Sequence, residues 1–134
     1  MLNRVRQLAL VLSGLATYVF DKPVLLMKLY RDDDKNNLPR AGFHYNGSLY
    51  FNTRYFEYKF AEKLVLQDEN ESNNDSTKHD IINFYFVKSC HLLVHNVYVN
   101  HDSKFIRTLE DTVMKFLPVK DSFFELFKFS WDFQ

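Results

Sequence analysis

The amino-acid sequence predicts one small α+β domain over residues 1–134, in which a central histidine-bearing helix packs on a small sheet or hairpin and other helices flank it. A length of 134 residues is typical of one domain. Hydrophobic residues make up 46% of the chain and aromatic residues 17%, which is enough to build a core. Most apolar residues recur at helical spacing, and the Asn46-Gly47 pair marks a β-hairpin, so we expect helices and strands in the same domain.

The first predicted element is a helix over residues 3–19. Four apolar residues recur there at the i, i+3, i+4, i+7 spacing of an amphipathic helix: Leu8, Val11, Leu12 and Leu15. Arg4 and Arg6 precede this stretch, and Gly14 and Ala16 supply small residues, which is also the outline of a signal peptide. The apolar run is far shorter than the roughly 20 residues of a membrane span. We therefore expect no membrane partner and keep secretion as the alternative.

A small sheet is expected from the next two segments. Residues 22–31 have the apolar character of a strand, which the polar run 32–37 closes. Asn46 and Gly47 separate two aromatic-rich runs within residues 42–52. Both residues tolerate the positive φ angles of a type I′ turn, so this segment is predicted to form a hairpin.

Helices are predicted for most of the second half. Residues 53–66 space their aromatic side chains helically, with charges between them. Residues 67–80 contain no apolar side chain and are predicted to form a mobile polar loop. Residues 80–97 follow as a long apolar helix, which we expect to be the central one.

The last predicted helix begins with Asp102 or Ser103 as its N-cap and ends at Pro118, because proline removes a backbone donor. A final aromatic segment is expected to start with Asp121 or Ser122 as its cap.

Charge and cysteine content exclude several classes of function. The chain has 17 basic and 17 acidic residues and no basic patch, so nucleic acid is not an expected partner. The single cysteine, Cys90, cannot form an internal disulfide, which favours a reducing, cytoplasmic compartment. No phosphate-binding glycine-rich loop is present, so we expect no nucleotide site within this chain.

The most specific chemical signal is a group of histidines. His91 and His95 are four residues apart, which places both side chains on one face of a helix. His101 lies six residues further, after a point where the chain could turn back. Three neutral imidazoles can hold zinc with a fourth position open to water. The alternative is an ordinary core helix that carries hydrogen-bonded histidines, while His44 and His79 are expected to be solvated.

The stretch HLLVHNVYVNHDSKF, residues 91–105, resembles the zincin signature HELxHNxxxxHxxxF of WLM-type and related minimal metallopeptidases. The hairpin FHYNGSLYFNTRYF and the segment FYFVKSCH resemble the C-terminal region of fungal sacsin-like proteins, large chains with a GHKL-type ATPase module at their other end. The similarity covers roughly residues 10–117. Leu92 and Val94 depart from the signature.

This resemblance implies specific roles. His91, His95 and His101 match the metal ligands, whereas Leu92 stands where the family has its general-base glutamate, so no catalytic residue is predicted. Asn96 and Asp102 are expected in the second shell of the metal, where such side chains orient the ligands. In zincins a sheet edge beside the metal helix holds an extended peptide. The residues expected to form that edge are Ser48, Leu49, Tyr50, Phe51 and Asn52.

Three functional hypotheses follow. The first is a degenerate, catalytically inactive zincin-like domain that binds zinc and acts as an interaction or folding module of a sacsin-like, chaperone-related protein. Its partner would be a protein or peptide, or an ATPase module of the same or another chain. The second is an active zinc peptidase with an unusual base, although no spacing places Asp102, Glu110 or Asp111 beside the metal-bound water. The third is a protein-binding module without metal.

Overall fold

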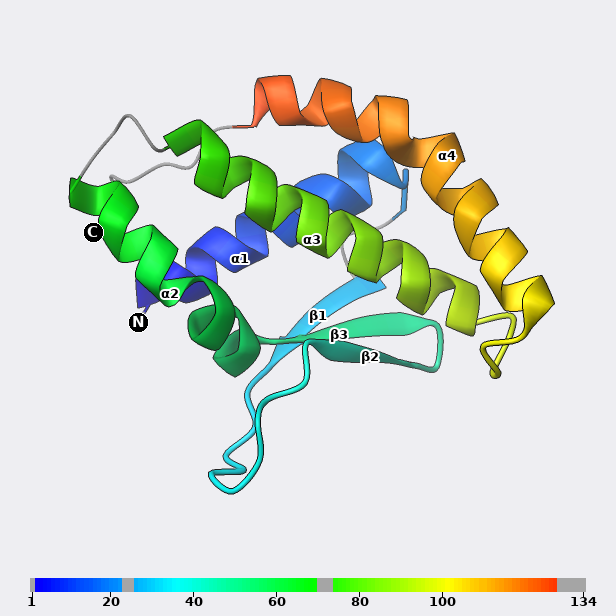
Figure 1. The fold of residues 1–134 in the computed structure, drawn as a ribbon, viewed down its shortest axis with the longest axis horizontal. Coiled ribbons are helices and arrows are strands. Elements are labelled where there is room, and N and C mark those ends of the chain that lie inside the picture. Colours follow the sequence, from blue (N-terminus) through cyan, green and yellow to red (C-terminus); the bar gives the residue numbers. More distant parts are fainter. Residues whose placement is uncertain (1, 23–25, 70–73, 128–134) are drawn as a thin grey trace.

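The computed structural model describes residues 2–22, 26–69 and 74–127, and it confirms the α+β class (Figure 1). The described residues form four α-helices, one π-helical segment and three strands, joined by turns and loops. In chain order they are α1 (Leu2–Gly14), η1 (Leu15–Val19), β1 (Met27–Tyr30), β2 (Gly42–Tyr45), β3 (Ser48–Asn52), α2 (Thr53–Glu69), α3 (Asn74–His95) and α4 (Ser103–Leu126). Helix α3 contacts α1, α2, α4, β2 and β3, which confirms its predicted central position.

The predicted hairpin is present, but the strand expected at the edge of the sheet is its centre. Asn46 and Gly47 have φ angles of 54° and 81°, as a type I′ turn requires. The strand order is β1-β3-β2, with β3 parallel to β1 and antiparallel to β2. Since β3 is paired on both sides, the prediction that Ser48–Asn52 offers a free peptide-binding edge is wrong. The predicted strand 22–31 is shorter than expected, and residues 23–25 lie outside the described part.

Alternation along β3 explains how the sheet joins the core. Leu49 and Phe51 are fully buried, whereas Ser48 and Tyr50 on the opposite face are partly exposed. The Phe51 ring packs edge-on against the ring of Tyr85 in α3, with 5.7 Å between centroids. The hydrophobic face of the sheet therefore lies against the central helix.

The N-terminal helix buries the predicted apolar face but changes its winding. Its four periodic residues are all buried: Leu8, Val11, Leu12 and Leu15. After Gly14 the helix widens into η1, where the Phe20 amide donates to the Leu15 carbonyl, five residues back. A Cβ atom on Gly14 would lie 2.3 Å from Cζ of Phe123, so the glycine allows α4 to approach closely.

The predicted polar loop 67–80 is largely helical. Residues 67–69 end α2 and residues 74–80 begin α3, while residues 70–73 lie outside the described part. An ion pair and a ring stack attach the start of α3 to its neighbours. Asp80 pairs with Lys63 of α2 at 2.7 Å, and His79, predicted to be solvated, stacks its exposed ring on Phe124 at 3.6 Å.

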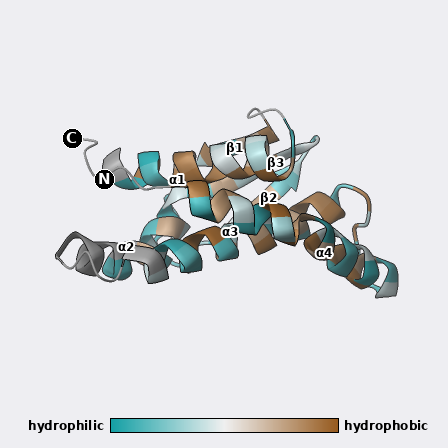
Figure 2. Ribbon diagram, turned by 90° about the horizontal axis from the view of Figure 1, so that it is seen from above, coloured by the Kyte–Doolittle hydropathy of each residue, from teal (hydrophilic) through white to brown (hydrophobic). Residues whose placement is uncertain are grey.

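Helix α4 passes through Pro118 instead of ending there. Asp102 caps its start, as predicted, because the Asp102 carboxylate accepts a hydrogen bond from the Phe105 amide. The helix continues to Leu126 because Phe123, Phe124 and the following Phe127 are buried, so Asp121 and Ser122 are not caps. Figure 1 shows α4 changing direction along its length, as an internal proline favours. Figure 2 shows hydrophobic and hydrophilic residues interleaved along the helices, as in amphipathic elements.

Candidate metal centre

The three predicted histidines meet where α3 ends and α4 begins. His91 and His95 lie on the last turns of α3, and His101 lies in the connection to α4. The Nε2 atom of His95 is 3.0 Å from that of His91 and 2.9 Å from that of His101, and the third Nε2 pair is 3.3 Å apart. These three side chains form a group that could hold a metal ion.

The number of nitrogens that meet, rather than their separation, favours a metal ion over hydrogen bonding. Ligand nitrogens about 2.0 to 2.1 Å from a tetrahedral zinc lie about 3.3 Å apart. A neutral imidazole has only one N–H, so three Nε2 atoms cannot all satisfy one another by hydrogen bonds. One cation that accepts three lone pairs resolves the arrangement and leaves a fourth position open.

A tight turn places His101 against the helix. The amides of Val97 and Tyr98 both donate to the Val94 carbonyl, at 3.0 Å and 2.9 Å, which closes α3. The Nδ1 atom of His95 then lies 3.0 Å from the Tyr98 carbonyl oxygen. Because a carbonyl only accepts, Nδ1 donates its hydrogen there and the lone pair of Nε2 is left for a metal.

Phe105 forms the floor of the cluster. It is 2% exposed, and its ring centroid lies 5.1 Å from that of His91, 4.5 Å from that of His95 and 4.7 Å from that of His101. The Asp102 cap fixes the first turn of α4, on which Phe105 lies. The cap and the aromatic floor together limit how far the imidazole rings can rotate.

The electrostatics of the site favour a neutral His91. Burial, together with electrostatic repulsion from Lys88, His95 and His101, lowers the pKa of His91 to about 4. His91 is therefore neutral at pH 7, which is the form that binds metal. Lys88 lies one helical turn before His91 and is half-buried, and burial lowers its pKa as well.

Residue 92, the position of the glutamate in the zincin signature, belongs to the core. Leu92 is 4% exposed and belongs to the main hydrophobic cluster. Glu110 and Asp111 are exposed on α4, and neither belongs to the metal-ligating group. A metal held here would act as a Lewis acid and could lower the pKa of its bound water, but no carboxylate stands ready to move the proton.

The predicted second shell is different in the structure. Asp102 serves as the helix cap, and the exposed Asn96 side chain makes no hydrogen bond to the described residues, so neither orients a histidine. The Tyr98 carbonyl does so for His95, and no side-chain motif could reveal a backbone group. His44 of β2, expected to be solvated, stacks on His95 with ring centroids 5.5 Å apart and planes 9° apart. Its inward position follows from strand alternation, since its partner Leu49 is buried.

Cys90 takes no part in the site. It is fully buried, and burial raises the pKa of its thiol to about 12, as expected for an inert core cysteine.

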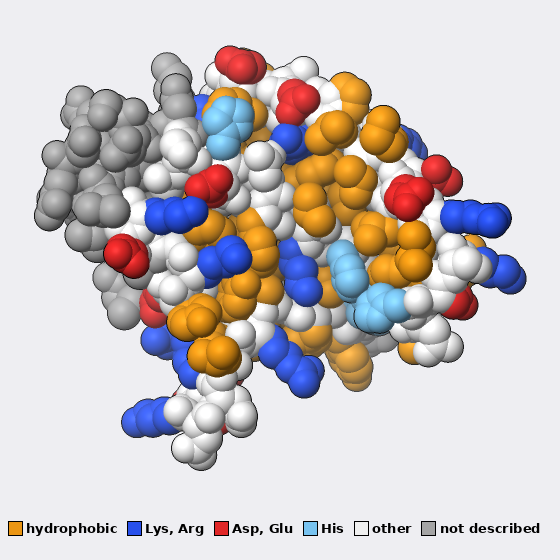
Figure 3. Space-filling view, in the orientation of Figure 1, with side chains coloured by type: hydrophobic (Ala, Val, Ile, Leu, Met, Phe, Trp, Pro, Cys, Tyr) orange, Lys and Arg blue, Asp and Glu red, His pale blue; other side chains and the backbone are white. Residues whose placement is uncertain are grey.

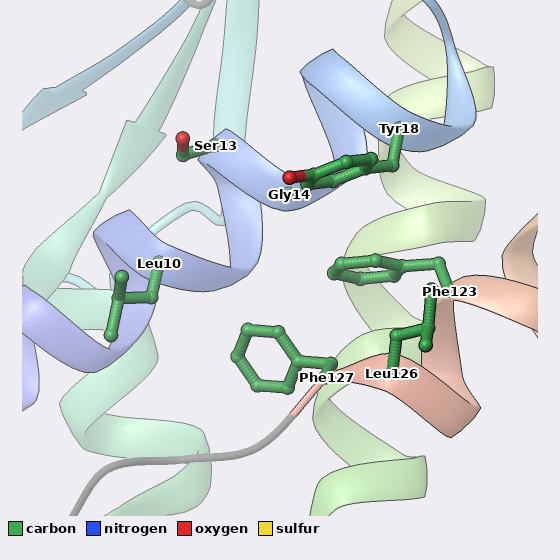
Figure 4. Close-up of a pocket in the computed structure, with 7 residues that line it drawn as sticks. All are labelled: Leu10, Ser13, Gly14, Tyr18, Phe123, Leu126 and Phe127. Carbon is green, nitrogen blue, oxygen red and sulfur yellow. The ribbon is translucent and has the colours of Figure 1, made fainter.

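The surface around the site and a cavity beside α1 differ in chemistry. Figure 3 shows histidine side chains gathered beside hydrophobic ones on the face seen in Figure 1. A cavity of about 370 Å³ lies between α1, η1 and the far end of α4 (Figure 4). Its lining includes Leu10, Tyr18, Phe123 and Leu126 and contains no histidine, cysteine or carboxylate. The cavity therefore offers apolar contact but no metal or acid–base chemistry.

None of the helices in residues 2–22, 26–69 and 74–127 is long and apolar enough to cross a membrane. Comparisons with protein-family models, with curated proteins and with solved structures found no match to this chain.

Proposed function

We propose that this chain is a zincin-like zinc-binding domain without peptidase activity, which acts as an interaction or folding module of a sacsin-like, chaperone-related protein in a reducing, cytoplasmic compartment. The observation that carries the proposal is the triangle of Nε2 atoms of His91, His95 and His101, with sides of 2.9 to 3.3 Å. Zinc is the metal of choice because it accepts imidazole ligands in tetrahedral sites of this size.

Zinc in this position would have a structural effect. His91 and His95 belong to α3, whereas His101 precedes α4, so one ion links the end of one helix to the start of the next. The free energy of metal binding then adds to the stability of the helix pair.

The absence of hydrolysis follows from Leu92. General acid–base assistance is worth about 10²- to 10⁴-fold in rate. Leu92 has no ionisable group, and it packs within the main hydrophobic core. An active peptidase with an unusual base is therefore the weaker hypothesis.

An interaction role has support from the surface next to the metal centre. Val97 and Val99 in the connecting loop are 70% and 80% exposed, and Ile106 on α4 is 50% exposed. Apolar side chains grouped on a surface are typical of protein contacts. Together with the sequence resemblance, they favour a protein or peptide partner, including an ATPase module.

The test is zinc stoichiometry by elemental mass spectrometry on protein purified without an affinity tag. We expect near one zinc per chain in the wild type and less than about 0.1 in a His91→Ala, His95→Ala double variant. A His79→Ala variant is the control, because His79 does not belong to the metal-ligating group, and it should retain its zinc. Absence of zinc from the wild type after supplementation would leave the metal-free binding module as the function.

A further inference from the structure

We propose that the open position of the metal centre binds a carboxylate, one oxygen of which coordinates the metal while the other accepts a hydrogen bond from the Lys88 ammonium. This inference rests on the proposed zinc-binding function and assigns the class of ligand that the centre takes.

The fourth position has no protein ligand in the described part of the chain. The metal-ligating group contains His91, His95 and His101 and no further histidine, cysteine, aspartate or glutamate. His44 lies face to face with the His95 ring, with planes 9° apart, so it braces this ligand from the side. His101 is exposed, and solvent and small solutes can therefore reach the ion.

The charge balance favours an anion in that position. Three neutral imidazoles leave the full charge of a divalent ion uncompensated. Lys88 is the cationic side chain that acts on His91, and no carboxylate is among the groups that do so. Asp102, next to His101 in the sequence, uses its carboxylate to cap α4.

Lys88 is the feature that selects a carboxylate. It lies three residues before His91, which places both side chains on one face of α3. It is half-buried, yet among the described residues it has no ion pair or hydrogen bond. Lys120 behaves differently: it is 7% exposed but bonds to Asn83 at 2.6 Å and to Asp121 at 2.8 Å. A partly desolvated ammonium without a partner is costly, and an anion on the metal would supply one.

Geometry makes a two-oxygen anion the best fit. Lys88 and His91 are one helical turn apart, so their Cβ atoms lie roughly 5 to 6 Å apart and a ligand of the ion lies within reach of the lysine side chain. A carboxylate presents two acceptors on one carbon and can bridge the ion and the ammonium. Figure 3 shows a basic side chain beside the histidines on this face.

The experiment uses the full chain loaded with cobalt(II), whose visible absorption reports the ligand in the fourth position. Acetate is the carboxylate probe, acetamide its uncharged analogue and imidazole a neutral metal ligand. The variants are Lys88→Met, which removes the charge and keeps the length, Lys88→Arg, which keeps the charge, and Lys35→Met, a control at an exposed loop lysine.

We expect acetate to bind the wild type and the Lys35→Met variant equally, and to bind Lys88→Met about tenfold or more weakly. Imidazole affinity should be the same in all variants, which shows that the metal site is intact, and Lys88→Arg should restore most of the acetate affinity. Equal acetate affinity in wild type and Lys88→Met, or acetamide binding as tight as acetate binding, would overturn the inference while leaving zinc binding in place. A wild-type chain that takes up no cobalt and no zinc would overturn the proposed function itself.

Discussion

The last two turns of α3 have two sides with opposite properties. On one side, His91 and His95 are partly exposed and direct their Nε2 atoms to a common point with His101. On the other side, Leu92 is 4% exposed and packs into the main hydrophobic core. The helical repeat explains how both sides coexist, since residues four apart share a face and adjacent residues diverge by about 100°.

In such a helix, metal binding and hydrolysis depend on different positions. The ligand positions depend on one face and on the turn that returns His101. The base position depends on residue 92 alone, where an apolar side chain gains burial energy. The geometry of a metal site can therefore form on a helix in which residue 92 is a core residue.

The largest expected effect on stability comes from placing a charged side chain at the buried position 92. Leu92→Glu should lower the free energy of unfolding by about 3 kcal/mol or more, because it places a carboxylate in the core and removes a packed side chain. Val87→Glu, on the same helix but at a 50% exposed position, should change it by less than about 0.5 kcal/mol. Urea denaturation measures both. Similar stabilities for the two variants would show that position 92 is not part of the core.

The second prediction concerns Phe105, whose ring packs against the rings of the three histidines. Phe105→Leu leaves the three histidines unaltered but removes the aromatic surface that contacts all of their rings. We expect zinc affinity to fall about tenfold, the lower range for loss of a supporting group. Isothermal titration with zinc provides the measurement, and Ile106→Leu at a 50% exposed position is the control. Unchanged affinity would mean that the rings are positioned without Phe105.

The third prediction concerns how the stability of the fold depends on the protonation of His91. Burial and the adjacent Lys88 and histidines lower the pKa of His91 from 6.5 to about 4 in the folded protein. Between these values the unfolded chain binds more protons, so this histidine favours folding fully above about pH 6.5, and its contribution is lost as the pH falls towards 4. NMR titration of the metal-free protein should place the His91 transition near pH 4. A transition near 6.5 would contradict the burial of this ring.

The smallest expected effect on zinc affinity comes from His44, which lies on strand β2. His44→Ala removes the ring that stacks on His95 but removes no ligand. Aromatic pairs contribute about 0.5 to 1.5 kcal/mol, of which only part bears on the metal, so zinc affinity should fall about two- to threefold. Competition with a fluorescent chelator resolves a change of this size. Complete loss of zinc would instead make His44 a ligand.

Local patterns predicted the parts of the molecule that depend on neighbouring residues. The Asn46-Gly47 turn, the Asp102 cap and the convergence of the three histidines all follow from short spacings and are present. In each case the determining contacts lie within about ten residues in the chain.

Contacts between distant segments determined what the sequence could not predict. Pro118 stays inside α4 because the buried Phe123 and Phe124 hold the following turns against the core. The polar start of α3 is held by Lys63, far away in α2. The central position of β3 depends on its parallel pairing with β1, which no local pattern encodes.

X-ray absorption at the zinc K-edge of the zinc-loaded protein reports which atoms are bound to the ion. We expect three imidazole nitrogens at about 2.0 to 2.1 Å and one oxygen in the fourth position. The His91→Ala, His95→Ala variant, prepared with the same amount of zinc, should lack this spectrum. A wild-type spectrum that shows one imidazole nitrogen or none would contradict the proposed zinc site. The same would follow if the double variant gave the wild-type spectrum.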